Sequence, residues 1–331
     1  MTNKTHLTRR SALTLLAAGV AMPALPKPAF AGQIETVALY GPPAGPSVTL
    51  SYAVASGGFS DLAANATFKA WRNPDELRAG LTSGEIGLSV VPVQAAANLY
   101  NRGFPIRLAN IMTNGLLYII SEDADIKTIA DLKGHSIAVP FRGDTPEIIF
   151  GQLLAHNGLD AKSDVSITYA GSPIEAMQLL LAGKVDAALT AEPATTAGIL
   201  KGKMAGKSVS RVVNIQKAWG DMTGAAPVLP QAGLAVTKSF LNQNGDVLPG
   251  ILEVLVKATD EVNADPNKVA ANSTEALGLP VPLLAASVPY SNLVARPANA
   301  ARGDIERMLT AMAGDDFARI GGKLPDDAFY L

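Results

Sequence analysis

Near its middle the sequence reads Ile137-Ala138-Val139-Pro140-Phe141-Arg142-Gly143-Asp144-Thr145-Pro146, an apolar run followed by a Gly-containing loop and a proline. About one hundred positions earlier it reads Val37-Ala38-Leu39-Tyr40, then a Gly/Pro loop and Pro46. Further landmarks recur with an offset that drifts only from 99 to 101, namely Gly58/Gly158, Pro74/Pro173, Glu76/Glu175, Leu81/Leu180, Gly84/Gly183, Pro92/Pro193 and Leu99/Leu200. Residues 37–99 and 137–200 are therefore two weak copies of one pattern.

Each copy predicts a strand, a loop, a Pro-started helix, a strand, a helix, a strand, a loop and a second Pro-started helix. The strand candidates are short and rich in β-branched or apolar residues: Ile34–Tyr40, Ile86–Val91, Ile137–Val139, Val165–Tyr169 and Val185–Leu189. Helical segments of roughly ten to fifteen residues separate them, which is typical of βαβ units and a parallel sheet. We therefore predict an α/β protein with two Rossmann-like lobes that face each other across a cleft.

Two extended segments, Ile111–Ile120 and Val228–Val236, are predicted to cross between the lobes. Two crossings make a two-strand hinge, which permits closure and restrains twisting. The first lobe would then comprise residues 32–114 and 232–331, and the second lobe residues 115–231.

The C-terminal part, residues 247–331, has no counterpart in the repeat. Its apolar pattern predicts helices entered through Pro249, from Pro266 toward Leu277, and over residues 298–313. We expect these helices to cover the first lobe, the alternative being a separate helical domain.

The first 31 residues are predicted to be an export signal and not part of the fold. Arg9-Arg10 precedes the apolar run 12–21, and Ala29-Phe30-Ala31 predicts cleavage before Gly32. The stretch Thr8–Leu13 resembles the twin-arginine signal, which exports folded proteins, but departures from that pattern leave the Sec route open. Ten apolar residues are too few for an anchor, because a membrane span needs about 20.

Composition narrows the class of protein further. The chain contains no cysteine, which excludes disulfides, thiolate metal sites, cysteine nucleophiles and a lipid-modified cysteine after the signal. We therefore expect a periplasmic protein that is exported and not lipid-anchored. Removing residues 1–31 takes away four of the 27 basic residues and none of the 29 acidic ones, so the net charge is near −6. Nothing here attracts nucleic acid or anionic lipid.

Ligands of open α/β sheets bind at the carboxyl ends of strands, where loops lead into helix N-termini. Four loops of this kind come in matched pairs: Tyr40–Ser47 with Phe141–Thr145, and Val91–Gln94 with Thr190–Thr195. Together with the first crossing they supply the predicted ligand-binding residues, which are Tyr40, Pro43, Gly45, Ser47, Gln94, Asn114, Arg142, Asp144, Thr145 and Glu192.

Several of these residues have an equally good structural interpretation. Asp144 or Thr145 could cap the helix entered at Pro146, and the amides at a helix start would stabilise Glu192 whatever its function. As a ligand contact, Glu192 would favour an NH or ammonium group. A bare oxyanion usually binds several converging donors or cations, and only Arg142 in these loops is basic. The residues therefore favour a neutral or zwitterionic compound rich in heteroatoms.

Catalysis has little support in the sequence. The mature chain holds only His135 and His156, too few for a histidine metal cluster. Motifs for hydrolase nucleophiles, phosphate-binding loops and zinc peptidases are absent. We therefore predict no catalytic residue, no metal and no cofactor.

Short motifs in a fixed order point to a family: Leu81-Thr82-Ser83-Gly84-Glu85-Ile86-Gly87, Ala130-Asp131-Leu132-Lys133-Gly134, Ala182-Gly183-Lys184-Val185-Asp186-Ala187-Ala188 and Glu192-Pro193. They resemble the periplasmic substrate-binding proteins of ABC importers, in the branch for nitrate, sulfonate, taurine and thiamine-pyrimidine precursors. The resemblance implies a type II periplasmic-binding fold that closes on a small polar ligand and docks on a membrane permease. It also implies that Pro43–Ser47, Arg142–Thr145 and Glu192 line the cleft.

We therefore expect a monomeric solute-binding protein that captures a sulfonate, a nitrate-like anion or an aminopyrimidine-like compound and delivers it to an ABC permease. One alternative is an enzyme on the same fold, in pyrimidine or menaquinone precursor biosynthesis. The missing cysteine and the export signal oppose it. The other alternative is a non-transport ligand sensor, which would need a transmembrane helix and a cytoplasmic domain.

Overall fold

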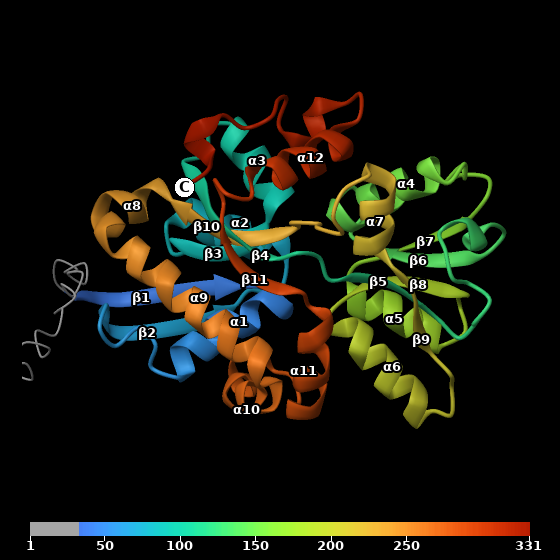
Figure 1. Ribbon diagram of the computed structural model, residues 1–331, viewed down its shortest axis with the longest axis horizontal. Helices are drawn as coiled ribbons and strands as arrows, with labels where there is room; N and C mark the ends of the chain where they lie inside the picture. The colour runs from blue at the N-terminus through green and yellow to red at the C-terminus, as the bar shows by residue number, and fades with distance from the viewer. Residues whose placement is uncertain (1–32) are drawn as a thin grey trace, which may run out of the picture.

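The computed structural model describes residues 33–331, and the predicted export signal lies outside the described residues. Figure 1 shows two sheets that lie beside each other, each flanked by helices. Between residues 33 and 331, no helix is both long enough and apolar enough to cross a membrane.

The first sheet has six strands in the order β11-β4-β10-β3-β1-β2. Its parallel strands are β1 (Ile34–Gly41), β2 (Ala63–Ala70) and β3 (Leu88–Pro92). Strand β10 (Ala232–Thr237) runs antiparallel between β3 and β4 (Ile106–Thr113), and β11 (Leu293–Pro297) forms the edge beyond β4. Strand β1 points toward the second sheet (Figure 1).

The second sheet has five strands in the order β7-β6-β8-β5-β9. Strands β6 (Ser136–Pro140), β7 (Ser166–Ala170) and β8 (Ala187–Ala191) are parallel. Strand β5 (Leu117–Ser121) runs antiparallel between β8 and the edge strand β9 (Ser210–Asn214).

The two sheets share one topology, because β10 lies between β3 and β4 as β5 lies between β8 and β9. The register repeats as well. Leu39 pairs with Leu88 where Ala138 pairs with Ala188, and Val90 pairs with Leu234 where Thr190 pairs with Tyr118. The repeat in the sequence is thus a repeat of structure, and the predicted pair of α/β units is confirmed.

The helices of the two copies also correspond. They are α1 (Gly45–Ala55), α2 (Pro74–Ser83) and α3 (Val93–Asn101) in the first copy, and α4 (Thr145–His156), α5 (Pro173–Leu181) and α6 (Ala194–Met204) in the second. Helix α7 (Ile215–Thr223) follows β9 and helix α8 (Lys238–Asn244) follows β10.

Capping explains why two of the landmarks recur. Asn73 accepts a hydrogen bond from the Glu76 amide at 2.9 Å, and Ser172 accepts one from the Glu175 amide at 3.1 Å. Each glutamate in turn accepts from the amide that precedes the capping residue. These reciprocal bonds satisfy the free amides at the starts of α2 and α5, so the sequence must keep a polar residue and a glutamate three positions apart.

The two crossings lie side by side. Residues 114–116 join β4 to β5, residues 224–231 join α7 to β10, and the Leu229 amide donates to the Asn114 carbonyl at 2.9 Å. Gly115 has a φ of 117°, and a Cβ atom there would collide with the Gln216 side chain. The predicted two-strand hinge is therefore present, and its first crossing requires a glycine. We propose the lobe boundaries stated above, because they keep all strands of each sheet in one lobe.

The C-terminal part belongs to this architecture and is not a separate domain. Helices α9 (Leu248–Ala264) and α10 (Pro266–Leu277) pack on α1, as predicted, and β11 joins the first sheet. Strands β9 and β11, helices α7 and α8 and the short helix α11 (Val281–Ser287) were not predicted from the sequence. The order of elements in the repeat predicted a strand in the place of β2, but without bounds.

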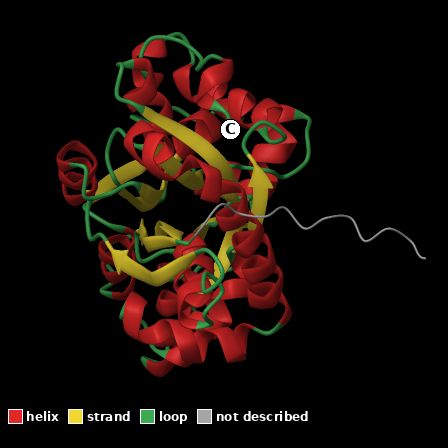
Figure 2. Cartoon of the chain, turned by 90° about the vertical axis from the view of Figure 1, so that its left-hand side faces the viewer, coloured by secondary structure: helices red, strands yellow, loops and turns green. Residues whose placement is uncertain are grey.

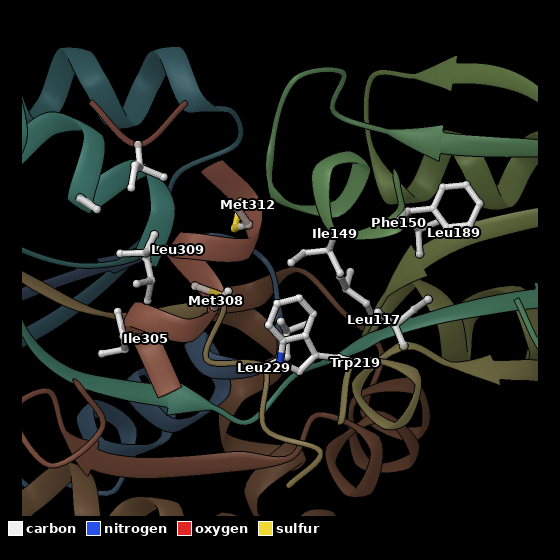
Figure 3. Close-up of a cluster of buried hydrophobic side chains, with 14 of the residues drawn as sticks. Leu117, Ile149, Phe150, Leu189, Trp219, Leu229, Ile305, Met308, Leu309 and Met312 are labelled. Carbon is white, nitrogen blue, oxygen red and sulfur yellow. The ribbon is translucent and has the colours of Figure 1, made fainter. Parts of the chain in front are cut away.

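Helix α12 (Arg302–Ala313) contacts α4 of the second lobe, and α11 contacts α6, so the C-terminal helices do not cover the first lobe alone. Figure 3 shows Met308 and Met312 of α12 facing Ile149 of α4 and Trp219 of α7. All four side chains are buried in one apolar cluster. The two lobes therefore share a continuous apolar core where α12 meets α4 and α7. Figure 2 shows helices on the outside of both lobes.

Candidate functional site

The first predicted loop leads into α1, whose first turn is buried and lacks a side-chain cap. Ser47 is fully buried, and its hydroxyl oxygen has no hydrogen-bond partner among residues 33–331. A Cβ atom at Gly41 would collide with that hydroxyl, so the glycine lets Ser47 lie over the end of β1. Free amides at a helix start carry partial positive charge, and a hydroxyl can donate. This end of α1 is therefore suited to an anionic or carbonyl oxygen.

The matching loop in the second copy leads into α4. Asp144 caps this helix by accepting from the Thr145 amide at 2.7 Å, which confirms the capping interpretation. The Thr145 side chain is buried, and its hydroxyl also has no partner within the described part of the chain. Arg142 is exposed and lies over the ring of Tyr169, 4.8 Å from its centroid. The only basic residue of the predicted loops is thus engaged at the surface.

Glu192 begins the turn between β8 and α6 and is completely buried. One carboxylate oxygen accepts from the Arg211 Nε at 3.0 Å and from Nη2 of the same guanidinium, and the other accepts from the Thr196 hydroxyl at 2.7 Å. Burial raises the pKa of Glu192, while Arg211 and Thr196 lower it. The carboxylate is bound within the protein, so its contacts favour the structural interpretation over a bond to a ligand NH group.

Four further predicted residues differ in how far they are buried and in what they contact. The side-chain amide of Gln94 donates to the Arg319 carbonyl at 2.5 Å, so it ties α3 to the C-terminal segment. Tyr40 is half-buried, and burial, with Glu85 nearby, raises its pKa. Pro43 is exposed in its loop, whereas Gly45 leaves no room for a Cβ atom because Ser291 lies against it.

Asn114 lies in the hinge. Its backbone amide donates to the Asn292 carbonyl at 2.9 Å, but its side-chain oxygen is buried without a partner among residues 33–331. The ten predicted residues thus contain three buried oxygens without a partner in the described chain, one from each lobe and one from the hinge: Ser47 Oγ, Thr145 Oγ1 and Asn114 Oδ1. A buried polar atom without a partner costs about 1–3 kcal/mol, so these atoms indicate where a ligand or water would bond.

Within 33–331, no set of three or more histidine, aspartate or glutamate side chains is placed to hold a metal ion. Arg211 binds Glu192 at the candidate site and was not among the residues predicted from the sequence. The signal available was a single arginine between the valines of the stretch Val209–Val213, the cation that a buried Glu192 requires.

Solved structures with the same fold cover nearly the whole chain. An ABC transporter protein from Parabacteroides distasonis has a TM-score of 0.72 at 23% identity, over 90% of this chain and 98% of that one. The periplasmic aliphatic sulphonate binding protein of Escherichia coli has a TM-score of 0.67 at 18% identity, over 88% and 95%. The alkanesulfonate-binding protein of Xanthomonas axonopodis pv. citri, bound to MOPS, has 0.64 at 19% identity, over 89% and 96%. The fold is that of the type II periplasmic-binding proteins.

The chain belongs to the NMT1-like family, whose model matches residues 43–277. A curated relative from Escherichia coli K12, provisionally named an aliphatic sulfonates-binding protein, is 25% identical over 172 residues. The match covers 52% of this chain and 49% of the relative, so the chain spans about half the length of that curated protein. The resemblance to substrate-binding proteins of ABC importers is confirmed.

Proposed function

We propose that this protein is a monomeric periplasmic solute-binding protein that holds a small anion between its lobes, delivers it to an ABC permease and catalyses no reaction. The relative and two of the solved structures are named as sulfonate-binding proteins, which supports the class. The single observation that carries the proposal is the buried, uncapped start of α1 with the partnerless hydroxyl of Ser47.

The site geometry changes the ligand class that the sequence favoured. The case for a ligand with an NH group rested on Glu192, whose carboxylate is bound by Arg211 and Thr196. The groups left for a ligand are the hydroxyls of Ser47 and Thr145 and the amides of helix starts, which can donate, and the side-chain oxygen of Asn114, which accepts. Because donors predominate and no carboxylate is free, these groups favour a sulfonate or a nitrate-like anion over an aminopyrimidine.

A ligand panel tests this proposal. Ethanesulfonate, taurine, nitrate and an aminopyrimidine would be titrated into the purified protein by isothermal calorimetry and thermal shift. We expect a sulfonate to raise the melting temperature, because a ligand at one hundred times its Kd stabilises the fold by about 2.7 kcal/mol. If only the aminopyrimidine binds, or if no anion binds, the proposed ligand class is wrong.

Two serine variants of α1 test the site. Ser47→Ala should weaken anion binding by about 10- to 100-fold, since a hydrogen bond to a charged group contributes about 1.5–3 kcal/mol. The ligand-free variant should be at least as stable as the wild type, because it loses a buried hydroxyl that has no partner among residues 33–331. Ser51→Ala is the control, because Ser51 is equally buried in α1 and donates to the Val48 carbonyl at 3.1 Å. Equal ligand affinity in Ser47→Ala and the wild type would remove Ser47 from the site.

A further inference from the structure

The guanidinium of Arg211 touches both lobes at once. It extends from the edge strand β9 of the second sheet, and only 17% of its side chain is exposed. Its edge donates to Glu192 and to the Thr196 hydroxyl, at 3.0 Å and 2.6 Å. Its flat face lies 3.5 Å from the ring centroid of Tyr290, which ends the short helix η3 (Val288–Tyr290) in the C-terminal part of the first lobe.

Neighbouring residues strengthen this contact between the lobes. The Tyr118 hydroxyl of β5 donates to the Tyr290 carbonyl at 2.9 Å, and the two rings meet edge to face with centroids 6.3 Å apart. Two residues further on, the Asn292 side chain donates to the Gly115 carbonyl in the hinge at 2.7 Å. Helices α11 and α6 also contact each other here. Tyr290 is thus held to the second lobe, and Asn292 to the first crossing, by noncovalent contacts that add to the two covalent crossings.

Arginine is the side chain that can make both kinds of contact. A guanidinium donates in the plane of its fork and still presents a flat face for stacking, whereas a lysine ammonium is a compact point charge. Glu192 neutralises Arg211 and also accepts from the Thr196 amide at 3.2 Å, which holds the first turn of α6. A movement of Arg211 would therefore disturb the start of α6 and the contact with Tyr290 together.

We propose that Arg211 is a positioning residue that couples the first turn of α6 to a latch between the lobes, with Tyr290 as the other half of the latch. Opening the lobes requires the Tyr290 ring to leave the guanidinium, and Glu192 keeps that guanidinium in place when the ring departs. The latch itself does not depend on the proposed function. Its effect on ligand release does rest on that function.

Two tyrosine variants test the latch without any ligand. Tyr290→Ala removes the ring that Arg211 contacts, and the 43% exposure of Tyr290 makes the truncation tolerable to the fold. Tyr290→Phe is the matched control, because it keeps the ring and the carbonyl that Tyr118 contacts. A cation–π contact at such a site changes the ratio of open to closed molecules about two- to fivefold. Small-angle scattering of the ligand-free protein should give a larger radius of gyration for Tyr290→Ala than for wild type and Tyr290→Phe.

Arg211→Lys supplies a second, independent variant. It keeps the positive charge beside Glu192 but loses the flat face and the paired donors, so its radius of gyration should also exceed that of the wild type. Equal radii in wild type, Tyr290→Ala and Arg211→Lys would overturn the latch, and so would an expansion in Tyr290→Phe equal to that in Tyr290→Ala.

A ligand experiment tests the coupling. With a sulfonate that the wild type binds, stopped-flow should show dissociation about two- to fivefold faster from Tyr290→Ala, and unchanged from Tyr290→Phe. If no sulfonate binds, the proposed function fails while the scattering result still decides the latch. If a sulfonate binds and leaves all three proteins at one rate, the coupling is wrong.

Discussion

Replacing Arg211 alone should damage the fold far more than replacing Arg211 and Glu192 together. The Glu192 carboxylate is fully buried and makes four hydrogen bonds, of which Arg211 supplies two and Thr196 two. Arg211→Met leaves a buried carboxylate with half of its partners, and breaking a buried pair in this way costs about 3–5 kcal/mol. The double variant Arg211→Met/Glu192→Leu also removes the cost of burying the charge. Its free energy of unfolding should fall within about 2 kcal/mol of the wild-type value.

The loss in the free energy of unfolding caused by Arg211→Met, here called the deficit, should also depend on pH. Burial already raises the pKa of Glu192 and Arg211 opposes this, so the pKa rises further when Arg211 is removed. A carboxyl whose pKa is higher in the folded protein stabilises the fold below its unfolded pKa, and that contribution is lost as the pH rises through the folded pKa. The deficit should therefore be smaller near about pH 4.5 than near about pH 7.5.

Urea unfolding followed by tryptophan fluorescence measures these differences, with both single variants and the double variant at both pH values. Trp219 is a suitable probe, because it is buried in the apolar cluster that spans the lobes. A loss of less than about 1 kcal/mol in the free energy of unfolding of Arg211→Met at the higher pH would refute a stabilising role of Arg211 beside the buried carboxylate. An equal loss of stability at both pH values, or a double variant as unstable as Arg211→Met, would refute it as well.

Two further predictions concern single side chains. The Tyr52 hydroxyl donates to Glu261 at 2.6 Å, which raises the pKa of Tyr52 to about 12. The stability from this bond should be complete below the ordinary tyrosine pKa and should disappear as the pH rises through about 12, and Tyr52→Phe should cost about 1.5–3 kcal/mol in urea at neutral pH. An ultraviolet titration in which Tyr52→Phe removes no late-ionising phenol would contradict this. Gly115→Ala should destabilise the fold by more than about 1 kcal/mol, because of the positive φ and the collision with Gln216. Gly151→Ala in α4, where a Cβ atom meets open space, should instead stabilise it by about 0.5–1 kcal/mol, and equal melting temperatures of the two variants would show that the hinge does not need its glycine.

The sequence predicted the elements whose local chemistry is strong. Strand β1 and helices α2 and α5 follow from apolar runs, first-turn prolines and paired caps, which act within a few residues. The repeat predicted a strand in the place of β2, but its residues could not be located, because Ala63–Ala70 contains one large apolar residue, Phe68, and lies at a half-exposed sheet edge. Strand β11 was missed because it ends in proline and pairs only with β4, so its existence depends on a partner nearly two hundred residues away.

At the candidate site, too, features set by the local sequence could be predicted and features set by distant residues could not. Helix starts at the carboxyl ends of strands could be located from the repeat, which is why Ser47 and Thr145 were among the predicted residues. The partner of a side chain could not be predicted in this way. Glu192 is bound by Arg211 from another strand, and Gln94 by the carbonyl of Arg319, which any residue type could supply.

The position of β10 in the first sheet has a consequence for how the chain is made. A ribosome has released every strand of the second sheet once Asn214 has emerged, whereas the first sheet still lacks the strand between β3 and β4. The strands within residues 34–113 cannot form the complete sheet until β10, residues 232–237, has been synthesised. The edge strand β11, Leu293–Pro297, is added later still. Sheets that depend on such distant partners assemble slowly. The first sheet, whose initial strands are synthesised first, is therefore the sheet that is completed last.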